Sequence, residues 1–149
     1  MRISTRGRYA LRLMTDVALH GGTGYVSLKD AAERQGLSAK YLEQIAGLLG
    51  KAGFLRSGRG AQGGYRLTRD PADYTLGSIL RLTEGDLTPV ACLGDGTPPC
   101  ERRDFCAARD FWAGLYGAVN DYVDRFTLAD MVRWEREKSG ETPCGTACL

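Results

Sequence analysis

Apolar residues recur every three or four positions within the first 20 residues, which is the spacing of one face of an α-helix. Ser4 supplies the side-chain oxygen that a helix N-cap needs, and Gly21 directly follows the periodic stretch. The sequence therefore predicts a core-facing helix that begins after Ser4 and ends before Gly21. Its apolar positions are Ala10, Leu11, Leu13, Met14, Val17, Ala18 and Leu19.

Two shorter helices are predicted next. Ser27, with Asp30 three positions later, has the form of a capping box in which aspartate replaces the usual glutamate, and Gly36 closes this helix. Ser38 is placed to cap the second helix, whose apolar stripe consists of Leu42, Ile45, Leu48 and Leu49. Two short helices separated by Gly-Leu-Ser are the signature of a helix-turn-helix, although a helix pair that only forms a core fits the same pattern.

A β-hairpin is predicted directly after this helix pair. Residues 54–57 and 65–68 alternate between apolar and polar side chains, and the glycine-rich stretch 58–64 permits positive φ angles. Such a hairpin makes a winged helix, and Arg59 and Gln62 at its tip suit the narrow, electronegative minor groove of DNA. An ordinary flexible hairpin is the alternative, but it does not explain a cluster of arginines: Arg56, Arg59, Arg66 and Arg69.

The C-terminal half predicts a short helix, an irregular loop and a long amphipathic helix. Thr75 is placed to cap a helix over 76–82, after which Gly and Pro residues argue against regular structure until Asp104. Thr127 is predicted to cap a last helix that reaches about Glu137. A long amphipathic helix is predicted from Ala107 to just before Thr127, because apolar residues there again lie three or four positions apart. They are Ala108, Phe111, Trp112, Leu115, Ala118, Val119, Tyr122, Val123 and Phe126.

This long apolar stripe needs a partner surface, because a small winged domain has little core with which to cover it. A symmetric dimer through the helix would also place two recognition helices about one DNA turn, roughly 34 Å, apart. Packing of the helix against its own winged domain is the alternative, and both arrangements can hold in part.

Together these patterns predict a mainly α fold with a small β-hairpin. Residues 1–85 are expected to form a winged helix-turn-helix DNA-binding domain, and residues 86–106 a cysteine-bearing loop. Residues 107–138 are expected to supply a dimerisation helix and a short C-terminal helix, and residues 139–149 a flexible tail.

Composition and charge support a DNA-binding protein. With 43% hydrophobic and 26% charged residues, the chain has the composition of a soluble globular protein, and no run approaches the roughly 18 apolar residues of a membrane span. The N-terminus lacks the apolar run of a secretory signal, so we expect a cytoplasmic protein. Residues 1–85 hold 13 Lys and Arg against 7 Asp and Glu, whereas the rest holds 7 against 11. The basic excess favours binding to phosphates, although a solvated basic face is equally compatible.

Three cysteines in the predicted loop, Cys92, Cys100 and Cys106, stand in C-x7-C-x5-C spacing. Thiolates are soft ligands for iron–sulfur clusters or zinc, and the spacing differs from the C-x2-C pairs of structural zinc sites, so a cluster is favoured. The total of five cysteines is odd, which in a reducing compartment indicates metal or redox chemistry rather than a disulfide framework. Cys144 and Cys148 in the tail are interpreted as free thiols rather than as spare ligands or a redox pair.

Several segments together resemble the IscR-like iron–sulfur cluster regulators of the Rrf2 (Rrf-two) family. They are the opening Met-Arg-Ile-Ser-Thr-Arg-Gly-Arg-Tyr-Ala, Glu33-Arg-Gln-Gly, Tyr41-Leu-Glu-Gln, the wing sequence Arg59-Gly-Ala-Gln-Gly-Gly-Tyr, the three cysteines and Thr127-Leu-Ala-Asp. The resemblance spans about residues 1–135. It implies a winged-helix homodimer that binds promoter double-stranded DNA under the control of a cluster on the three cysteines.

The resemblance also implies which residues face DNA. Arg59 would enter the minor groove from the wing, and Glu43 on the recognition helix can accept a hydrogen bond from cytosine N4 in the major groove. The recognition helix would present Ser38, Lys40, Tyr41, Glu43 and Gln44.

The chain departs from the family pattern at the fourth cluster ligand. IscR-like proteins place a histidine three residues after the third cysteine, where this chain has Arg109, and a protonated guanidinium has no lone pair to donate. Some relatives use an acidic residue at the position of Arg8. The fourth ligand is left open among Asp110, Asp104, Glu101, water and a small thiol, and 2Fe-2S is favoured over 4Fe-4S.

The predicted function is a homodimeric transcriptional regulator, usually a repressor, that senses iron–sulfur, redox or nitric oxide status. The alternative within regulation is a metal-free thiol or cysteine-metabolism regulator of the same family. A redox enzyme or electron carrier is disfavoured, because a chain with one histidine offers no Ser/His/Asp or Cys/His catalytic set. That histidine, His20, ends the first helix and is better explained by a capping or surface role. A carrier would also have no use for a basic wing.

Overall fold

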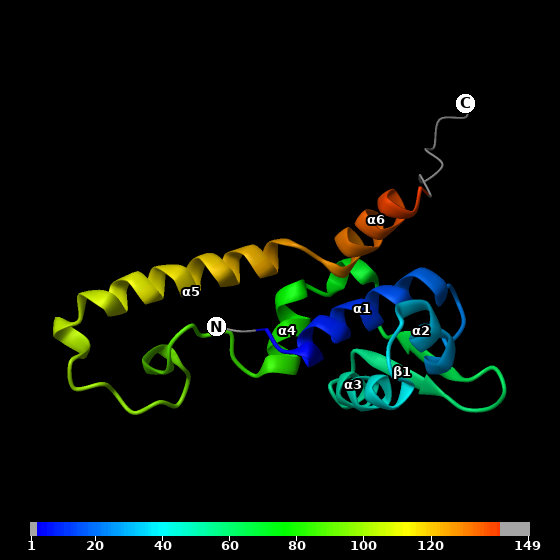
Figure 1. Ribbon diagram of the computed structural model, residues 1–149, viewed down its shortest axis with the longest axis horizontal. Coiled ribbons are helices and arrows are strands. Elements are labelled where there is room, and N and C mark those ends of the chain that lie inside the picture. The colour runs from blue at the N-terminus through cyan, green and yellow to red at the C-terminus, as the bar shows by residue number, and fades with distance from the viewer. Residues whose placement is uncertain (1–2, 141–149) are drawn as a thin grey trace.

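The computed structural model describes residues 3–140, which form six α-helices and one two-stranded antiparallel sheet (Figure 1). This confirms the predicted mainly α fold with a small hairpin. No helix in residues 3–140 is both long and apolar enough to cross a membrane. In chain order the elements are α1 (Thr5–His20), α2 (Leu28–Gln35), α3 (Ala39–Lys51), β1 (Leu55–Gly58), β2 (Gly64–Leu67), α4 (Leu76–Glu84), α5 (Ala107–Arg125) and α6 (Leu128–Ser139).

The core is built around α1, which contacts α2, α3, α4, α6 and β2. Its fully buried apolar side chains are those that the helical periodicity predicts, and α3 turns its predicted stripe toward them. The centre of the core is formed by Ala10, Leu13, Met14, Val17, Leu42, Ile45, Leu49, Tyr74, Ile79 and Leu128.

Side-chain caps set most of the helix starts. The Ser4 hydroxyl accepts hydrogen bonds from two backbone N–H groups of α1, and Thr75 caps α4 in the same way. Thr127 forms a reciprocal capping box with Asp130 at α6. Ser38 occupies the N-cap of α3 but its side chain makes no capping hydrogen bond, so this prediction is wrong. Its carbonyl begins the helix instead, and its hydroxyl stays exposed.

Some boundaries differ from the predicted ones. The first strand starts one residue later, at Leu55, while α4 and α6 run two residues further than predicted, to Glu84 and Ser139. Ser27 accepts the N–H of Asp30, which is one half of the predicted capping box. The loop between α4 and α5 contains two one-turn 3₁₀ helices, Ala91–Leu93 and Arg103–Phe105, where no regular structure was expected.

The hairpin pairs Leu55 with Leu67 and Gly58 with Gly64, so the wing loop spans residues 59–63. A bridge to Val26 ties the wing to the segment before α2, because Val26 and Tyr65 exchange two backbone hydrogen bonds of 2.8 Å. Gly64 permits this close approach: its φ is 149°, and a Cβ there would collide with the backbone of Val26. The wing therefore has a defined direction relative to the helix pair.

Tyr74 is fully buried, and its hydroxyl holds the base of the wing. It donates to the carbonyl of Phe54 at 3.0 Å and accepts the backbone N–H groups of Thr68 and Arg69 at 3.1 and 3.0 Å.

We expect Tyr74→Phe to lower the free energy of unfolding by about 1–3 kcal/mol, because these buried groups lose their partner. Urea denaturation followed by circular dichroism measures the effect; Tyr122→Phe, at an exposed tyrosine, is the control and should change nothing.

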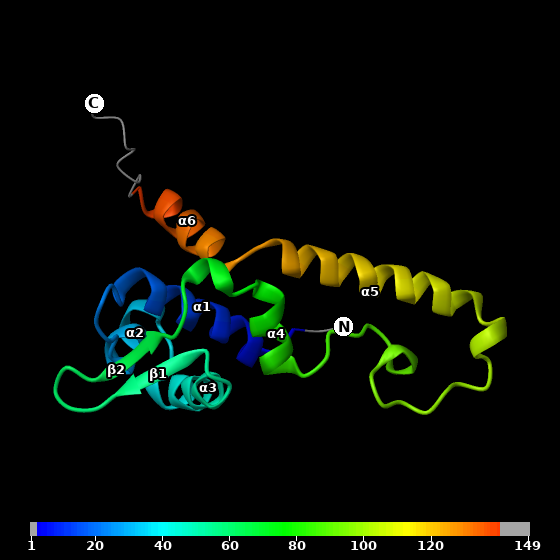
Figure 2. The ribbon, with the colours of Figure 1, turned by 180° about the vertical axis from the view of Figure 1, so that it is seen from behind.

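The longest helix, α5, extends away from the winged domain as an arm (Figure 1). The loop that carries the cysteines returns beneath the far end of this arm, whereas the wing protrudes at the opposite end of the molecule (Figure 2). The wing and the three loop cysteines therefore lie at opposite ends of the molecule, and α4 and α5 connect the loop to the winged domain.

Candidate nucleic-acid interface and cysteine loop

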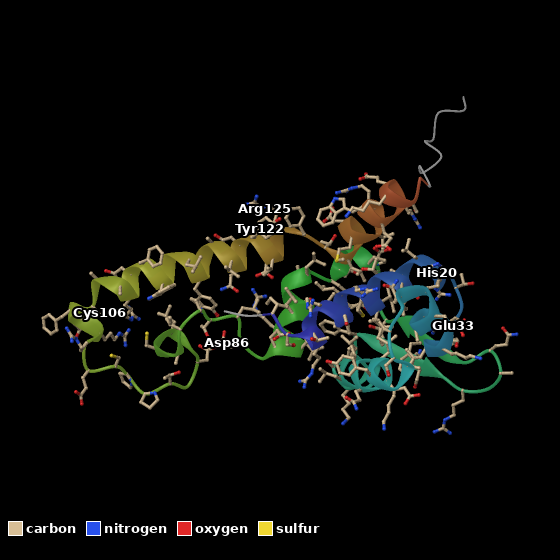
Figure 3. All side chains as sticks on the ribbon, viewed as in Figure 1. His20, Glu33, Asp86, Cys106, Tyr122 and Arg125 are labelled. Atoms are coloured by element: carbon tan, nitrogen blue, oxygen red, sulfur yellow. The ribbon has the colours of Figure 1, made fainter. Side chains whose placement is uncertain are left out.

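The residues predicted to face DNA lie on one surface formed by α3 and the wing. On α3 the apolar face enters the core, and on the other side Ser38, Lys40, Glu43 and Gln44 are exposed. Nitrogen-tipped side chains project from α3 and the wing tip on the side away from α5 (Figure 3). This surface is free to enter a groove. Tyr41 is half-buried, and Arg59 and Gln62 are exposed at the wing tip.

The expected arginine cluster on the wing is only partly available to a ligand. The guanidinium of Arg69 stacks over the rings of Tyr74 and Phe54, at 4.6 and 5.1 Å from their centroids, and Arg66 stacks over Tyr25 at 5.1 Å. Cation–π stacking on aromatic rings of the same domain stabilises both positions. Arg56 and Arg59 are exposed on the wing, and among the four arginines only Arg59, at the tip, is predicted to contact DNA.

An ion pair with a buried carboxylate links the helix-turn-helix to α1. Asp16 is completely buried and accepts two hydrogen bonds from Arg34 of α2, at 3.0 and 2.7 Å, and a third from Gln35 at 3.2 Å. Such a bidentate pair holds α2, and through it α3, in a set orientation. The apolar periodicity alone does not predict this pair, although Asp16, a charged residue among the apolar positions of the first helix, is a signal for it. His20 lies beside Asp16, with 3.6 Å between Nδ1 and Oδ1.

The structure brings only two of the three loop cysteines to a common hollow. Cys92 and Cys100 line a space of about 220 Å³ together with Arg103 and Arg109, whereas Cys106, at the N-cap of α5, does not line it. The proposed fourth ligands Glu101, Asp104 and Asp110 are all exposed.

This arrangement tests the fit of a cluster. Among residues 3–140 no three His, Cys, Asp or Glu side chains form a group that could hold a metal ion. The thiol chemistry of the loop suits a cluster, but the three sulfur atoms are not gathered here. Cys144 and Cys148 lie outside the described residues, as does nearly all of the predicted tail.

A polar joint connects the arm to the winged domain. Arg81 on α4 donates to both carboxylate oxygens of Asp124 on α5, at 2.8 and 2.6 Å, and also to Asn120 at 2.6 Å. The hydrogen bonds from Arg81 hold the pKa of Asp124 below its usual value, so this carboxylate stays charged at neutral pH. Asp86, where the loop begins, accepts a hydrogen bond of 3.3 Å from Tyr116 of α5.

The arm carries two neighbouring apolar stripes with different surroundings. Trp112, Val119 and Val123 are half-buried on the side that meets the winged domain. The adjacent stripe is exposed: Phe111, Leu115 and Tyr122 have exposed fractions of 67%, 37% and 61%. Next to it, α4 and α5 enclose an apolar hollow of about 410 Å³. Packing on its own domain thus accounts for one stripe, and no element among residues 3–140 covers the other.

Comparison with known proteins agrees with the winged helix-turn-helix fold. A model of the Rrf2 family, described as an iron-dependent transcriptional regulator, matches residues 3–134. The chain belongs to the Rrf2 family of transcriptional regulators. It is 40% identical over 133 residues to protein rrf2 of Nitratidesulfovibrio vulgaris, an alignment that covers 89% of this chain and 88% of the relative.

Two solved Rrf2-type structures resemble the fold closely. CymR, the global cysteine regulator of B. subtilis, superposes with a TM-score of 0.77 and 40% identity, covering 90% of this chain and 98% of CymR. IscR of T. potens gives a TM-score of 0.73 and 39% identity, covering 97% of this chain and 94% of IscR. The winged helix fold is confirmed, and the chain is a DNA-binding regulator of transcription, not an enzyme. Similarity to both proteins leaves the signal open.

Proposed function

We propose that this Rrf2-family chain acts as a homodimer that binds promoter DNA through α3 and the wing and responds to a signal received at the cysteine loop. The observation that carries the proposal is the exposed polar face of α3, followed directly by a wing with Arg59 and Gln62 at its tip. Major-groove reading by a helix and minor-groove insertion by an arginine need this combination.

An iron–sulfur cluster on Cys92, Cys100 and Cys106 is the first candidate for the sensing group. It is supported by three thiols on one loop and by the relationship to IscR. A bound cluster would supply chemistry that responds to oxidants, nitric oxide or iron supply. Arg109 holds no lone pair for the remaining iron position, so we propose a carboxylate of Asp110, Asp104 or Glu101, or a non-protein ligand, in its place.

Metal-free thiol sensing is the second candidate, and two observations favour it. The three sulfur atoms are not gathered within the described part of the chain, and the fold resembles CymR, a cysteine regulator, as closely as it resembles IscR. In both cases the loop can reach the DNA-binding domain by the same route. Asp86 and Tyr116 link the start of the loop to α5, and Arg81 and Asp124 link α5 to α4.

A change in the loop alters DNA affinity only if it stabilises one arrangement of the two winged domains over another. Dimerisation through the exposed stripe of α5 makes this possible, because each winged domain is then attached to the shared arm by its Arg81 and Asp124 joint. The spacing of the two α3 helices would follow the position of the arms.

Selection of duplexes from a random-sequence pool tests the DNA-binding part of the proposal. We expect the wild-type protein to enrich a palindromic site, and we expect Arg59→Ala to weaken binding to that site by about 1–3 kcal/mol and to reduce the preference for A/T-rich steps beside it. Fluorescence anisotropy on the selected duplex measures both effects. Lys138→Ala on α6 removes a charge far from α3 and serves as the control; equal affinity of wild type and Arg59→Ala would disprove the role of the wing.

A further inference from the structure

The first turns of α1 carry arginines that no part of the proposed function uses. Arg6 and Arg8 are exposed, and none of the ion pairs found within residues 3–140 includes either of them. The acidic residue closest to the start of this helix is already engaged. The carboxylate of Glu84 accepts hydrogen bonds from Ser4 and from the backbone N–H of Gly7, at 2.7 and 3.0 Å.

Arg6 lies beside the recognition helix. With Tyr41, Gln44, Ile45 and Leu48 it lines a hollow of about 240 Å³ between α1 and α3. In a helix of 3.6 residues per turn, Tyr41 and Leu48 share one flank of α3, and Gln44 lies between that flank and the exposed face. Arg6 therefore borders the edge of the surface that is proposed to enter the groove.

Arg8 contacts the ring of Tyr9, and Tyr9 in turn packs against Tyr41 of α3. Its guanidinium lies 5.9 Å from the centroid of the Tyr9 ring, and Tyr9 meets Tyr41 edge to face at 5.8 Å. Arg12, which also stacks on Tyr9, is occupied by hydrogen bonds to Gln35. Arg6 and Arg8 lie on different sides of the first turns of α1, since two residues span about 200° of a helix. Neither is held in an ion pair among residues 3–140, and Arg8 makes one side-chain hydrogen bond, to Thr5. A partner with regularly spaced negative charge suits both.

We propose that Arg6 and Arg8 form a phosphate-binding strip that extends the DNA interface from α3 onto the first helix. The strip rests on the proposed function, because it takes α3 to be the groove-reading helix. Contacts to phosphates from this position would flank the groove that α3 enters and fix the depth of the helix without reading sequence.

The salt dependence of DNA binding tests the strip. The probes are the duplex selected by wild-type protein and an unrelated duplex of the same length, each titrated at several salt concentrations. Arg6→Gln together with Arg8→Gln should reduce the slope of log affinity against log salt by about 1.8 for each bound subunit, since each lost phosphate contact contributes about 0.9. The loss should be equal on both duplexes.

Charge-preserving variants separate a phosphate contact from a structural role. Arg6→Lys with Arg8→Lys should keep the wild-type slope, and so should Lys138→Ala, which removes a charge from α6. An unchanged slope in the glutamine variant, or equal losses in the glutamine and lysine variants, would overturn the strip while DNA binding itself stands. Failure of the wild-type protein to select any duplex would instead reject the proposed function.

Discussion

Anaerobically purified wild-type protein is expected to be brown, and Cys106→Ala is expected to abolish its visible absorption together with its bound iron and sulfide. A cluster on three thiolates loses one of them with this substitution, and the rest of the loop holds no histidine to replace the missing sulfur. Cys92→Ala and Cys100→Ala should have the same effect. Absorption spectra with iron and sulfide analysis measure it directly.

Cys144→Ala is the matched control, since Cys144 is a thiol of the same chain outside the loop and is predicted to have no ligand role. Its spectrum should equal that of the wild type. A colourless protein that stays free of iron after reconstitution would contradict the cluster. It would leave the winged fold and the DNA surface in place and favour thiol sensing by the loop cysteines.

Affinity for the selected duplex should then be compared between proteins with and without the chromophore. A difference would show that the loop communicates with α3, and the joint at Arg81 and Asp124 is the place to interrupt it. Cys92 and Cys100 line one hollow and Cys106 does not, so binding of a cluster to all three thiolates would have to bring Cys106 toward that hollow.

Local signals in the sequence predict this fold well because they act over a few residues. The caps at Ser4, Thr75 and Thr127 and the glycine at position 36 correctly mark helix ends, since each works through backbone groups nearby. Ser38 shows the limit of such a signal. A hydroxyl at an N-cap position can cap or remain free, and the local sequence does not decide between these states.

The features that the sequence does not predict join residues that are distant in the chain. Arg69 and Tyr74 are close enough to suggest a contact, but the stacking of Arg66 on Tyr25 depends on the path of the wing past the segment before α2. The ion pair of Asp16 and Arg34 requires the packing of two helices. Cysteine spacing predicts the chemistry of the loop, whereas convergence of the three sulfur atoms depends on a loop fold that spacing alone does not encode.

The proposed dimer depends on the exposed apolar stripe of α5, so two substitutions in that stripe should disrupt it. Phe111→Glu together with Leu115→Glu is expected to convert the protein to a monomer and to weaken its binding to a palindromic duplex by about 10²-fold or more. If the dimer still formed through the exposed apolar stripe of α5, the two glutamate charges would be buried in its interface. Loss of the dimer also removes the second, linked binding event on the palindromic duplex. Size-exclusion chromatography with light scattering measures the mass, and anisotropy measures the affinity.

Ala113→Glu is the matched control because Ala113 is exposed on the opposite side of the same helix. It adds the same side chain, which favours helix formation, without charging the stripe. The control should remain a dimer with wild-type affinity, and all variants should keep the circular dichroism spectrum of the parent. A double variant that stays dimeric would place the interface elsewhere. The long arm would then need another reason to expose Phe111 and Tyr122, since its contacts with α4 already bury the neighbouring stripe.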